Sequence, residues 1–416
     1  MFYRQPNYFN DFKCVGGTCT NSCCIGWCID WSEKEIDKIK NAPKCSPELK
    51  ELCEKSFMYD EKRKKYVVIL EKTNRCPFLT EDNFCKIQKE LGAEYLGVTC
   101  TIYPRHYLKT GFAIYRHCNM TCPEIMNKLL NDDQCMNMIN MDRKSRKPLK
   151  IGSTLDSRDN LAKHPEQKYA GKIIEFFYEI ISDKELPLES CIILGALVAQ
   201  SLTKLVEAKQ YDRIPEAITS LKAQMRNPEQ LKSIKNIKPN YNVKLGVTDK
   251  LIREFASSRT VDTFIDGDGK PNIDFYNRAE LLLDKQFESR QFAWRNIALN
   301  LLLELNVPFK LAESTILENY SVFVMSYVFL RYSALTVESH NDKINKEYDN
   351  EVSDSGNTIK LKFKVRREID TEDYIIRFGA TLSRFLCHND ERLKSILQRL
   401  KDLGMTSPAY LALLVK

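Results

Sequence analysis

The stretch Cys14-Val-Gly-Gly-Thr-Cys19-Thr-Asn-Ser-Cys23-Cys24-Ile-Gly-Trp27 places four thiols within eleven residues. Gly16 and Gly17 let the backbone fold tightly there. Such spacing brings several sulfurs within reach of one inorganic centre, where a Zn–S bond is about 2.3 Å, and iron–sulfur clusters also use closely spaced thiolates. The adjacent Cys23 and Cys24 cannot easily both bind one zinc ion. A cluster offers separate corners, so the doublet favours iron–sulfur over zinc.

Cysteine is concentrated at the start of the chain, because 13 of the 15 cysteines lie between Cys14 and Cys135. Cys76, Cys85, Cys100, Cys118 and Cys122 form a second group. The first ten residues lack the apolar core of a secretory signal, so we expect a reducing cytoplasm and metal binding rather than disulfides. A lone cysteine is more often a small buried hydrophobe. That description suits six positions: Cys28, Cys45, Cys53, Cys135, Cys191 and Cys387.

The composition of the 416 residues is that of a globular protein, with 43% hydrophobic residues and a formal net charge of +7. The one tight basic run, Lys62 to Lys65, has no interleaved aromatic residues, so no nucleic-acid partner is predicted. The densest apolar run, Cys191 to Ala199, is too short to cross a bilayer and predicts a buried helix. We therefore expect a cytoplasmic protein with no membrane partner.

The predicted fold is mainly α, with a cysteine-rich metal-binding module at residues 1–150 that contains short β elements. Ser32 and Glu35 form a capping box, and Cys122-Pro-Glu opens a second helix. Tyr66–Lys72 and Thr110–His117 are predicted strands. Residues 151–416 form a mostly helical domain that is a candidate for binding substrate. Its helices are expected within 172–181, 190–208, 212–225, 278–305, 311–335, 373–387, 391–403 and 408–414, with a loop at 227–247 and an edge strand at 359–365.

The pattern F-x-C-x-G-x-x-C-x-x-S-C-C-x-G-W at Phe12–Trp27 resembles the opening signature of the flagellin lysine-N-methylase family. The later CPFL, YPR and CPE segments resemble the same family, and the cysteine pattern overlaps that of putative zinc- or iron-chelating proteins. The carboxy-terminal half matches more loosely, at Ile316–Tyr320 and from Ser383 to His388. The matching cysteines are the predicted metal ligands: Cys14, Cys19, Cys23, Cys24, Cys76, Cys85, Cys100 and Cys122.

The resemblance implies methyl transfer from S-adenosylmethionine to lysine side chains of flagellin, by a protein that carries a 4Fe–4S cluster. No Gly-rich turn for the methyl donor is visible, so its binding residues are unassigned. Tyr103 is predicted to orient the lysine amine and Arg105 to hold a carboxylate, since both follow Cys100. The alternative is that Tyr103 shapes a turn and Arg105 binds backbone carbonyls. The rival functions are a zinc- or iron-binding interaction protein without catalysis, and a redox protein.

Overall fold

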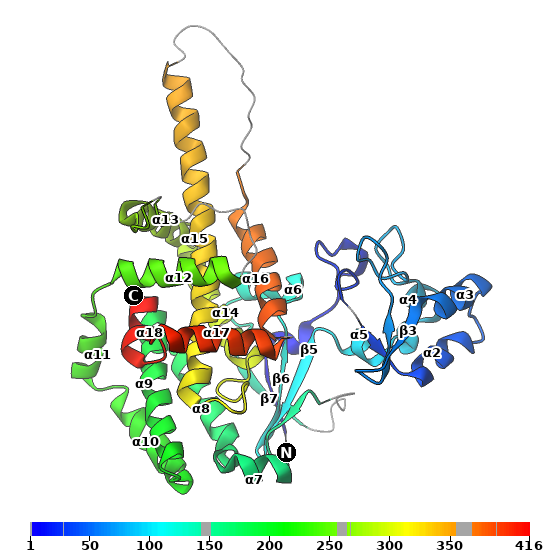
Figure 1. Ribbon diagram of the computed structural model, residues 1–416, viewed down its shortest axis with the longest axis horizontal. Helices are drawn as coiled ribbons and strands as arrows, with labels where there is room; N and C mark the ends of the chain where they lie inside the picture. The colour runs from blue at the N-terminus through cyan, green and yellow to red at the C-terminus, as the bar shows by residue number, and fades with distance from the viewer. Residues whose placement is uncertain are drawn as a thin grey trace.

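The computed structural model describes residues 2–27, 29–142, 151–255, 264–266, 268–354, 368–387 and 389–416. Figure 1 shows a small lobe, built from the early part of the chain, beside a larger helical body. Each lobe has its own hydrophobic core. The core of the body draws on both the first residues of the chain and the late helices, whereas the core of the small lobe uses residues between Trp31 and Leu91.

The small lobe pairs a three-stranded sheet with short helices. Its strands are β2 (Asp30–Trp31), β3 (Phe57–Asp60) and β4 (Lys65–Val68), in the order β2-β4-β3 and antiparallel throughout. Its helices are α2 (Glu33–Lys40), α3 (Pro47–Ser56), α4 (Lys86–Leu91) and α5 (Val98–Ile102). The capping box before α2 is confirmed, because the Ser32 side chain accepts from the Glu35 N–H while the Glu35 carboxylate accepts from the Ser32 N–H.

A five-stranded sheet forms one side of the body. Its order is β7-β1-β6-β5-β8, with β1 at Phe2–Pro6, β5 at Arg105–Lys109, β6 at Ala113–Cys118, β7 at Met138–Met141 and β8 at Ser153–Thr154. Strand β1 is parallel to β6, and β5 and β6 form an antiparallel hairpin in which Arg105 pairs with Cys118. Helix α1 (Tyr8–Asp11) follows β1, and helix α6 (Pro123–Asn131) follows β6.

The remainder of the body is helical. Its helices are α7 (Arg158–Lys163), α8 (Ala170–Ser182), α9 (Leu188–Glu207), α10 (Ile214–Gln224), α11 (Pro228–Lys235), α12 (Tyr241–Phe255), α13 (Ile273–Gln286), α14 (Phe292–Glu304), α15 (Ile316–Asp354), α16 (Thr371–Cys387), α17 (Asp390–Asp402) and α18 (Pro408–Val415). Helix α15 passes through the body against α9, α13, α14 and α16 (Figure 1). The prediction of a mainly α fold is confirmed.

The predicted loop at 227–247 is wrong, because α11 and most of the first half of α12 occupy it. The Asn227 side chain caps α11 by accepting from the N–H groups of Glu229 and Gln230, and Pro228 takes the first helical position. The predicted strand at 359–365 lies outside the described residues. The predicted domain boundary at residue 150 stays a prediction. The hydrophobic core of the body contains residues from both sides of that position.

Within the part of the chain that the structure describes, two helices are long and apolar enough to cross a membrane by length and composition alone, at Leu188–Glu207 and Ile316–Ile344. Both pack inside the body, and 94% of the apolar window in the second is buried. Core helices of this kind are expected where one element is surrounded by others. The predicted buried helix around Cys191–Ala199 is confirmed, since it lies within α9.

Candidate metal centre

The thirteen cysteines whose side chains the structure describes are all free thiols. Five of the eight predicted ligands have a backbone N–H from two residues further along directed at their sulfur. The donor and the cysteine that accepts are, in each case: Gly16 to Cys14, Asn21 to Cys19, Phe78 to Cys76, Ile87 to Cys85 and Glu124 to Cys122. Amide donors of this kind favour the thiolate form that a metal requires.

Helix starts supply the donors at two of these positions. Cys85 is the N-cap of α4 and Cys122 is the N-cap of α6. Burial raises the pKa of Cys122 to about 12, and the N–H groups of Glu124 and Ile125 oppose that rise. A metal ion or cluster would remove the cost of burying the charged sulfur, because coordinated thiols are deprotonated.

One set of thiols, which we call the inner group, lies within the small lobe and consists of Cys24, Cys76, Cys85 and Cys100. The Cys76 N–H donates to the Cys24 carbonyl at 2.8 Å. Leu79 forms an isolated antiparallel β-bridge with Cys85. Cys100 lies on α5, and all four pack with the core of the small lobe. Burial raises the pKa of Cys100, and the charges of the other three thiols raise it further.

A second set, the junction group, lies where the small lobe meets the body and consists of Cys14, Cys19, Cys23 and Cys122. Cys122 packs in the body core, and Cys14 and Cys19 lie just after Phe12, another residue of that core. Gly16 has φ of +62°, and a Cβ on Gly17 would lie 2.6 Å from the Asp82 carbonyl. The glycines therefore allow the loop to lie against the 82–84 segment, a contact that the sequence analysis did not predict.

Cys23 of the junction group and Cys24 of the inner group are adjacent in the chain, and their thiols form a hydrogen bond with each other. That bond lowers the pKa of Cys24, aided by the Ser22 hydroxyl and by the charge of Arg75. The same bond and burial raise the pKa of Cys23. The hydrogen bond thus favours the thiolate form at Cys24 and the protonated form at Cys23.

No three His, Cys, Asp or Glu side chains among the described residues stand close enough together to hold a single metal ion. Within each set the thiols still act on one another's charge, because Cys24, Cys85 and Cys76 raise the pKa of Cys100, and Cys19 and Cys14 raise the pKa of Cys122. A cluster spreads its ligands over separate iron atoms, so its thiolates stand farther apart than four ligands of one ion. The soft, all-sulfur donor set is of the kind that iron–sulfur clusters and zinc ions both use.

Tyr103 lies beside Cys122 and Cys23 of the junction group, and its predicted place near a metal bound by Cys100 stays a prediction. Its hydroxyl donates to Thr121 Oγ1 at 3.1 Å, and its ring meets Trp27 edge-on with 6.3 Å between ring centres. Burial raises the pKa of Tyr103 above its usual range, and the charges of Cys122 and Cys23 add to that effect. Tyr103 is therefore a neutral phenol that can donate or accept one hydrogen bond.

Arg105 contacts the segment that carries Cys14. Its Nη2 donates to the Phe12 carbonyl at 3.3 Å, and its guanidinium lies 5.0 Å from the centre of the Phe12 ring. These contacts match the backbone-binding alternative for Arg105. Its predicted role in holding a substrate carboxylate stays a prediction.

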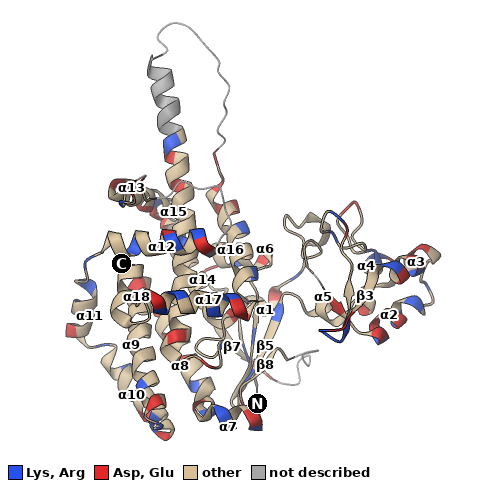
Figure 2. Ribbon diagram, in the orientation of Figure 1, with Lys and Arg blue, Asp and Glu red and all other residues tan. Residues whose placement is uncertain are grey.

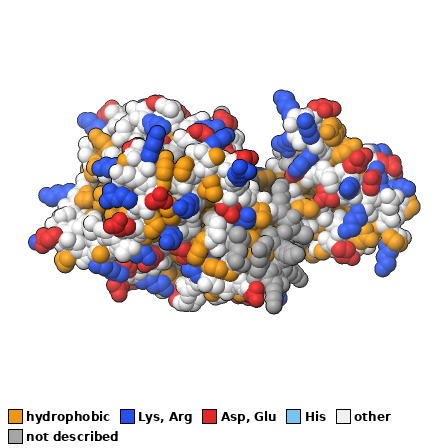
Figure 3. Space-filling model, turned by 90° about the horizontal axis from the view of Figure 1, so that it is seen from below, with side chains coloured by type: hydrophobic (Ala, Val, Ile, Leu, Met, Phe, Trp, Pro, Cys, Tyr) orange, Lys and Arg blue, Asp and Glu red, His pale blue; other side chains and the backbone are white. Residues whose placement is uncertain are grey.

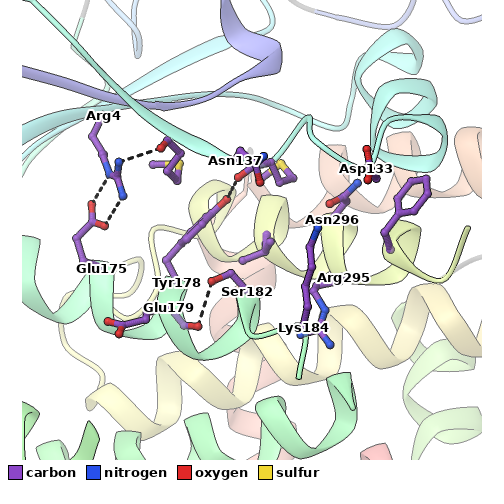
Figure 4. A pocket seen from close by; sticks show the side chains of 14 residues that line it. Arg4, Asp133, Asn137, Glu175, Tyr178, Glu179, Ser182, Lys184, Arg295 and Asn296 are labelled. Carbon is purple, nitrogen blue, oxygen red and sulfur yellow. Dashed lines mark hydrogen bonds and ion pairs between the residues drawn. The ribbon is translucent and has the colours of Figure 1, made fainter. Parts of the chain in front are cut away.

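A pocket of about 480 Å³ lies in the body between β1, α8 and α14 (Figure 4). Arg4 binds Glu175 on one wall at 3.0 Å, and the Tyr178 hydroxyl donates to the Met136 carbonyl. Asp133 and Glu179 place further carboxylates in the lining. The volume falls within the usual range of small-molecule sites, which is about 300–1,000 Å³.

The pocket and the junction group lie at opposite ends of α6. Cys122 caps the start of α6, whereas Asn296 on the pocket wall donates to the Leu129 and Asp132 carbonyls near its end. A helix rises about 1.5 Å per residue, so roughly 15 Å separates the two sites. Sequence reasoning missed the pocket, because its lining comes from β1, α8 and α14, which are distant in the chain.

A buried polar network beside Cys118 and Cys122 was also missed. The Tyr8 hydroxyl donates to Asn300 Oδ1 at 2.6 Å, and the buried Glu304 accepts from the Met120 N–H and from the Ser383 hydroxyl. The sequence does contain a signal for this network, namely the polar residues Asn300 and Glu304 within the apolar run of α14. Buried polar groups need hydrogen-bond partners, so their presence there predicts such a network. The network connects α14 and α16 to the segment that carries Cys122.

Charged residues are mixed over both lobes. Figure 2 shows Lys and Arg alternating with Asp and Glu along the outer helices. On the face in Figure 3 the two signs are interspersed, and no large patch of one sign appears there. This agrees with a solvated mixed surface for a chain of net charge +7.

Comparisons with known proteins give the family. Residues 175–414 match the model of the FliB lysine N-methylase C-terminal domain. The flagellar biosynthetic protein FliU of Salmonella muenchen is 26% identical over 135 residues, which are 32% of this chain and 79% of FliU. The lysine-N-methylases of Salmonella choleraesuis and Salmonella typhimurium are each 27% identical over 145 residues.

The alignments with the two lysine-N-methylases cover 32% of this chain and 33% of each of those proteins, so the chain spans about a third of their length. No solved structure matches. The family model covers more than half of the chain. The protein therefore belongs to the FliB lysine N-methylase family.

Proposed function

We propose that this protein transfers methyl groups from S-adenosylmethionine to lysine side chains of a protein substrate in the cytoplasm, with flagellin as that substrate. The match of residues 175–414 to the FliB lysine N-methylase model carries the proposal. The relatives named lysine-N-methylase and flagellar biosynthetic protein support the reaction and the substrate.

An iron–sulfur cluster on the predicted thiolates is part of the proposal. The thiolate donor set and the amides directed at the sulfurs support metal binding, and the adjacent Cys23 and Cys24 favour a cluster over zinc because a cluster offers them separate corners. When bound, a 4Fe–4S cluster supplies an electron-accepting iron centre. The cysteines of this chain would hold it, and the small lobe would be ordered by it.

Lysine methylation needs a neutral amine, and free lysine has a pKa of about 10.4. A tyrosine or carboxylate beside the amine is the usual means of removing its proton. The pocket offers the carboxylates of Asp133 and Glu179 together with the Tyr178 ring. We place the methyl donor and the amine there, because its volume and its groups of both charges suit a zwitterionic sulfonium compound.

Tyr103 is the competing position for the amine, as the sequence predicted. The two assignments exclude each other, because about 15 Å of helix α6 separates them. Tyr103 is enclosed by Trp27 and Thr121, whereas the pocket has room for a ligand. The volume of the pocket therefore favours it as the reaction site.

The test is incubation of the anaerobically purified protein with flagellin and methyl-labelled S-adenosylmethionine, with label on flagellin lysines as the expected result. Labelled lysine would exclude the non-catalytic interaction protein. No label from a protein that contains its metal would overturn the methylase proposal. Reversible colour change with a chemical reductant in that case would favour the redox protein.

Binding of the methyl donor to the pocket is tested by calorimetry. Asp133→Asn combined with Glu179→Gln should weaken binding about a hundredfold or more, since hydrogen bonds to charged groups contribute about 1.5–3 kcal/mol each. Glu185→Gln is the matched control, because Glu185 lies on the same side of the body but outside the lining. Equal affinity in both variants would exclude this pocket.

A further inference from the structure

A small cavity lies in the body where helix α12 packs against α15 and α18. Its volume is about 20 Å³. Its walls combine the apolar side chains of Leu335, Leu414 and Val415 with polar groups from α12, α13 and α15. The cavity is distinct from the larger pocket near Arg4, because the two have no lining residue in common.

Two hydroxyl groups in the walls of this cavity lack a hydrogen-bond partner. Thr248 is fully buried and Tyr327 is 2% exposed, yet neither hydroxyl is bonded to any group in the part of the chain that the structure describes. A threonine within a helix often donates to the carbonyl of the preceding turn, as Thr219 does to Pro215. Burial of an unbonded hydroxyl is unfavourable, so these two groups indicate a ligand that accepts from them.

Lys244 brings a positive charge to the same cavity and is only 8% exposed. With respect to the described residues it forms no ion pair and no hydrogen bond, and its Nζ lies 4.9 Å from the centre of the Tyr276 ring. The Glu280 carboxylate acts on Lys244 at longer range. That carboxylate has partners of its own, because it accepts from the Tyr276 hydroxyl at 3.1 Å and lies 3.8 Å from Arg331 Nη2. Burial lowers the pKa of Lys244, as expected for an ammonium group without a close counter-charge.

We infer that Lys244, Thr248 and Tyr327 together bind one small monovalent anion of the size of chloride. Lys244 and Thr248 share a face of α12, since they are four residues apart, and Tyr327 comes from α15. A water molecule fits the volume, because about 10–15 Å³ is enough for one, but it would leave the buried ammonium charge unbalanced. Phosphate and sulfate have several heavy atoms and are too large for 20 Å³.

The anion joins helix α12 to the central helix α15 beneath the last helix of the chain. Its site requires both helices in place, because two of its ligands come from α12 and the third from α15. The unfolded chain therefore has no such site, and the anion stabilises the folded body by mass action. This role is independent of the methylase reaction and of any metal on the cysteines.

The test is thermal unfolding of the full-length protein, purified without oxygen, in sodium chloride and in sodium gluconate at the same pH and ionic strength. Chloride should raise the Tm of the body by several degrees, and the Tm should rise with the logarithm of the chloride concentration. Screening of surface charges is the same in both salts and gives no such difference. Equal Tm values in the two salts would overturn the inference.

Substitutions in the cavity show where the anion binds. Lys244→Met and Thr248→Val should each lose most of the rise in Tm that chloride produces. Lys250→Met is the matched control, because Lys250 lies on the same helix and is exposed, and it should keep the full rise. A rise of the same size in Lys244→Met and Lys250→Met would show that chloride acts elsewhere, and would overturn the inference.

A second measurement needs no variant, so it holds even if the substituted proteins fold poorly. Crystals of the wild type grown in sodium bromide should show anomalous scattering from bromide in the cavity, within hydrogen-bond distance of Lys244 Nζ and the Tyr327 hydroxyl. A water molecule in that position, or an empty cavity, would overturn the inference. Neither result bears on the methylase proposal, which depends on the labelling of flagellin.

Discussion

The guanidinium carbon of Arg384 lies 3.9 Å from the centre of the Trp27 ring, so helix α16 holds the cysteine-rich start of the chain. Arg384 Nη2 also donates to the Gly26 carbonyl at 2.7 Å and to the Ile25 carbonyl at 3.2 Å. A guanidinium stacked on an aromatic ring with its N–H groups on carbonyls restrains both position and orientation.

Arg384→Ala should loosen the small lobe without unfolding the body. Losing the stack and two hydrogen bonds costs about 1–3 kcal/mol, so amide exchange at residues 25–27 should rise about tenfold or more. Arg377→Ala on the same helix is the control, because its ion pair with Asp373 is exposed and contributes little. Equal exchange in both variants would show that Arg384 does not restrain the lobe.

Gly195→Ala should destabilise the body. A Cβ on Gly195 would lie 2.0 Å from the hydroxyl of Tyr320, which is buried and donates to the Ile192 carbonyl at 2.9 Å. Forcing helices α9 and α15 apart costs about 1–3 kcal/mol and should lower the Tm of the body by several degrees.

Gly246→Ala is the matched control for that substitution. Gly246 lies within α12 and has nothing within 4 Å of an added Cβ. Alanine has a higher helix propensity than glycine by about 1 kcal/mol, so this variant should be as stable as wild type or more so. Equal Tm values for the two variants would show that the Gly195–Tyr320 contact does not determine how closely α9 and α15 pack.

His117 should make the protein less stable as the pH falls. Burial lowers the pKa of His117 well below its usual value, and nearby His106 and Lys310 add to that effect. The unfolded chain binds a proton near pH 6.5 whereas the folded chain does not, so stability is full above pH 6.5 and falls below it. The slope for one proton is about 1.4 kcal/mol per pH unit.

The measurement is denaturant unfolding between pH 7.5 and 5, monitored in the body. His117→Phe should remove that one-proton slope, and His340→Gln on the partly buried part of α15 should keep it. A slope that is the same in all three proteins would assign the acid sensitivity to other groups.

Tyr178→Phe and Tyr103→Phe separate the two proposed positions of the amine. Neither phenol is the proton acceptor, because burial raises the pKa of both, so the comparison tests which one positions the amine. If reaction occurs in the pocket, Tyr178→Phe should lower kcat severalfold and Tyr103→Phe should not, while Glu179→Gln should lower kcat about a hundredfold, since a positioned proton acceptor contributes about 10²–10⁴-fold. Tyr410→Phe is the control, because that ring is exposed. The reverse pattern, with the iron content unchanged, would move the amine to Tyr103.

Local sequence patterns predicted those helices whose start residues or apolar periodicity can be read from a short stretch of the chain. The Ser32–Glu35 box and Cys122-Pro-Glu both begin helices, and the apolar periodicities of the body gave most of its helices. Asn227-Pro228-Glu229 carried a start signal of the same kind, but the Lys and Asn residues around it suggested a loop. The order of the five-stranded sheet could not be predicted, because β1 pairs with β6 across more than a hundred residues.

The kind of site, a metal held by thiolates, stays a prediction, and the arrangement of the thiols could not be predicted from the sequence. Residue type and compartment pointed to thiolate ligands, since both follow from chemistry that the sequence displays. The division into an inner and a junction group depends on long-range contacts such as that between Cys24 and Cys76. The pocket depends on Arg4 of β1 meeting Glu175 of α8, which are 171 residues apart.

The contact between Gly26 and Arg384 spans 358 residues, which sets an order of events during synthesis. A chain leaves the ribosome amino terminus first, so the small lobe emerges long before α16 exists to hold it. Its thiols would be accessible to cellular metal-delivery proteins throughout that interval. Cys122 is also made early, whereas its neighbours on α14 and α16 come much later. If these thiols bind metal as proposed, loading can take place before Arg384 joins the lobe to the body.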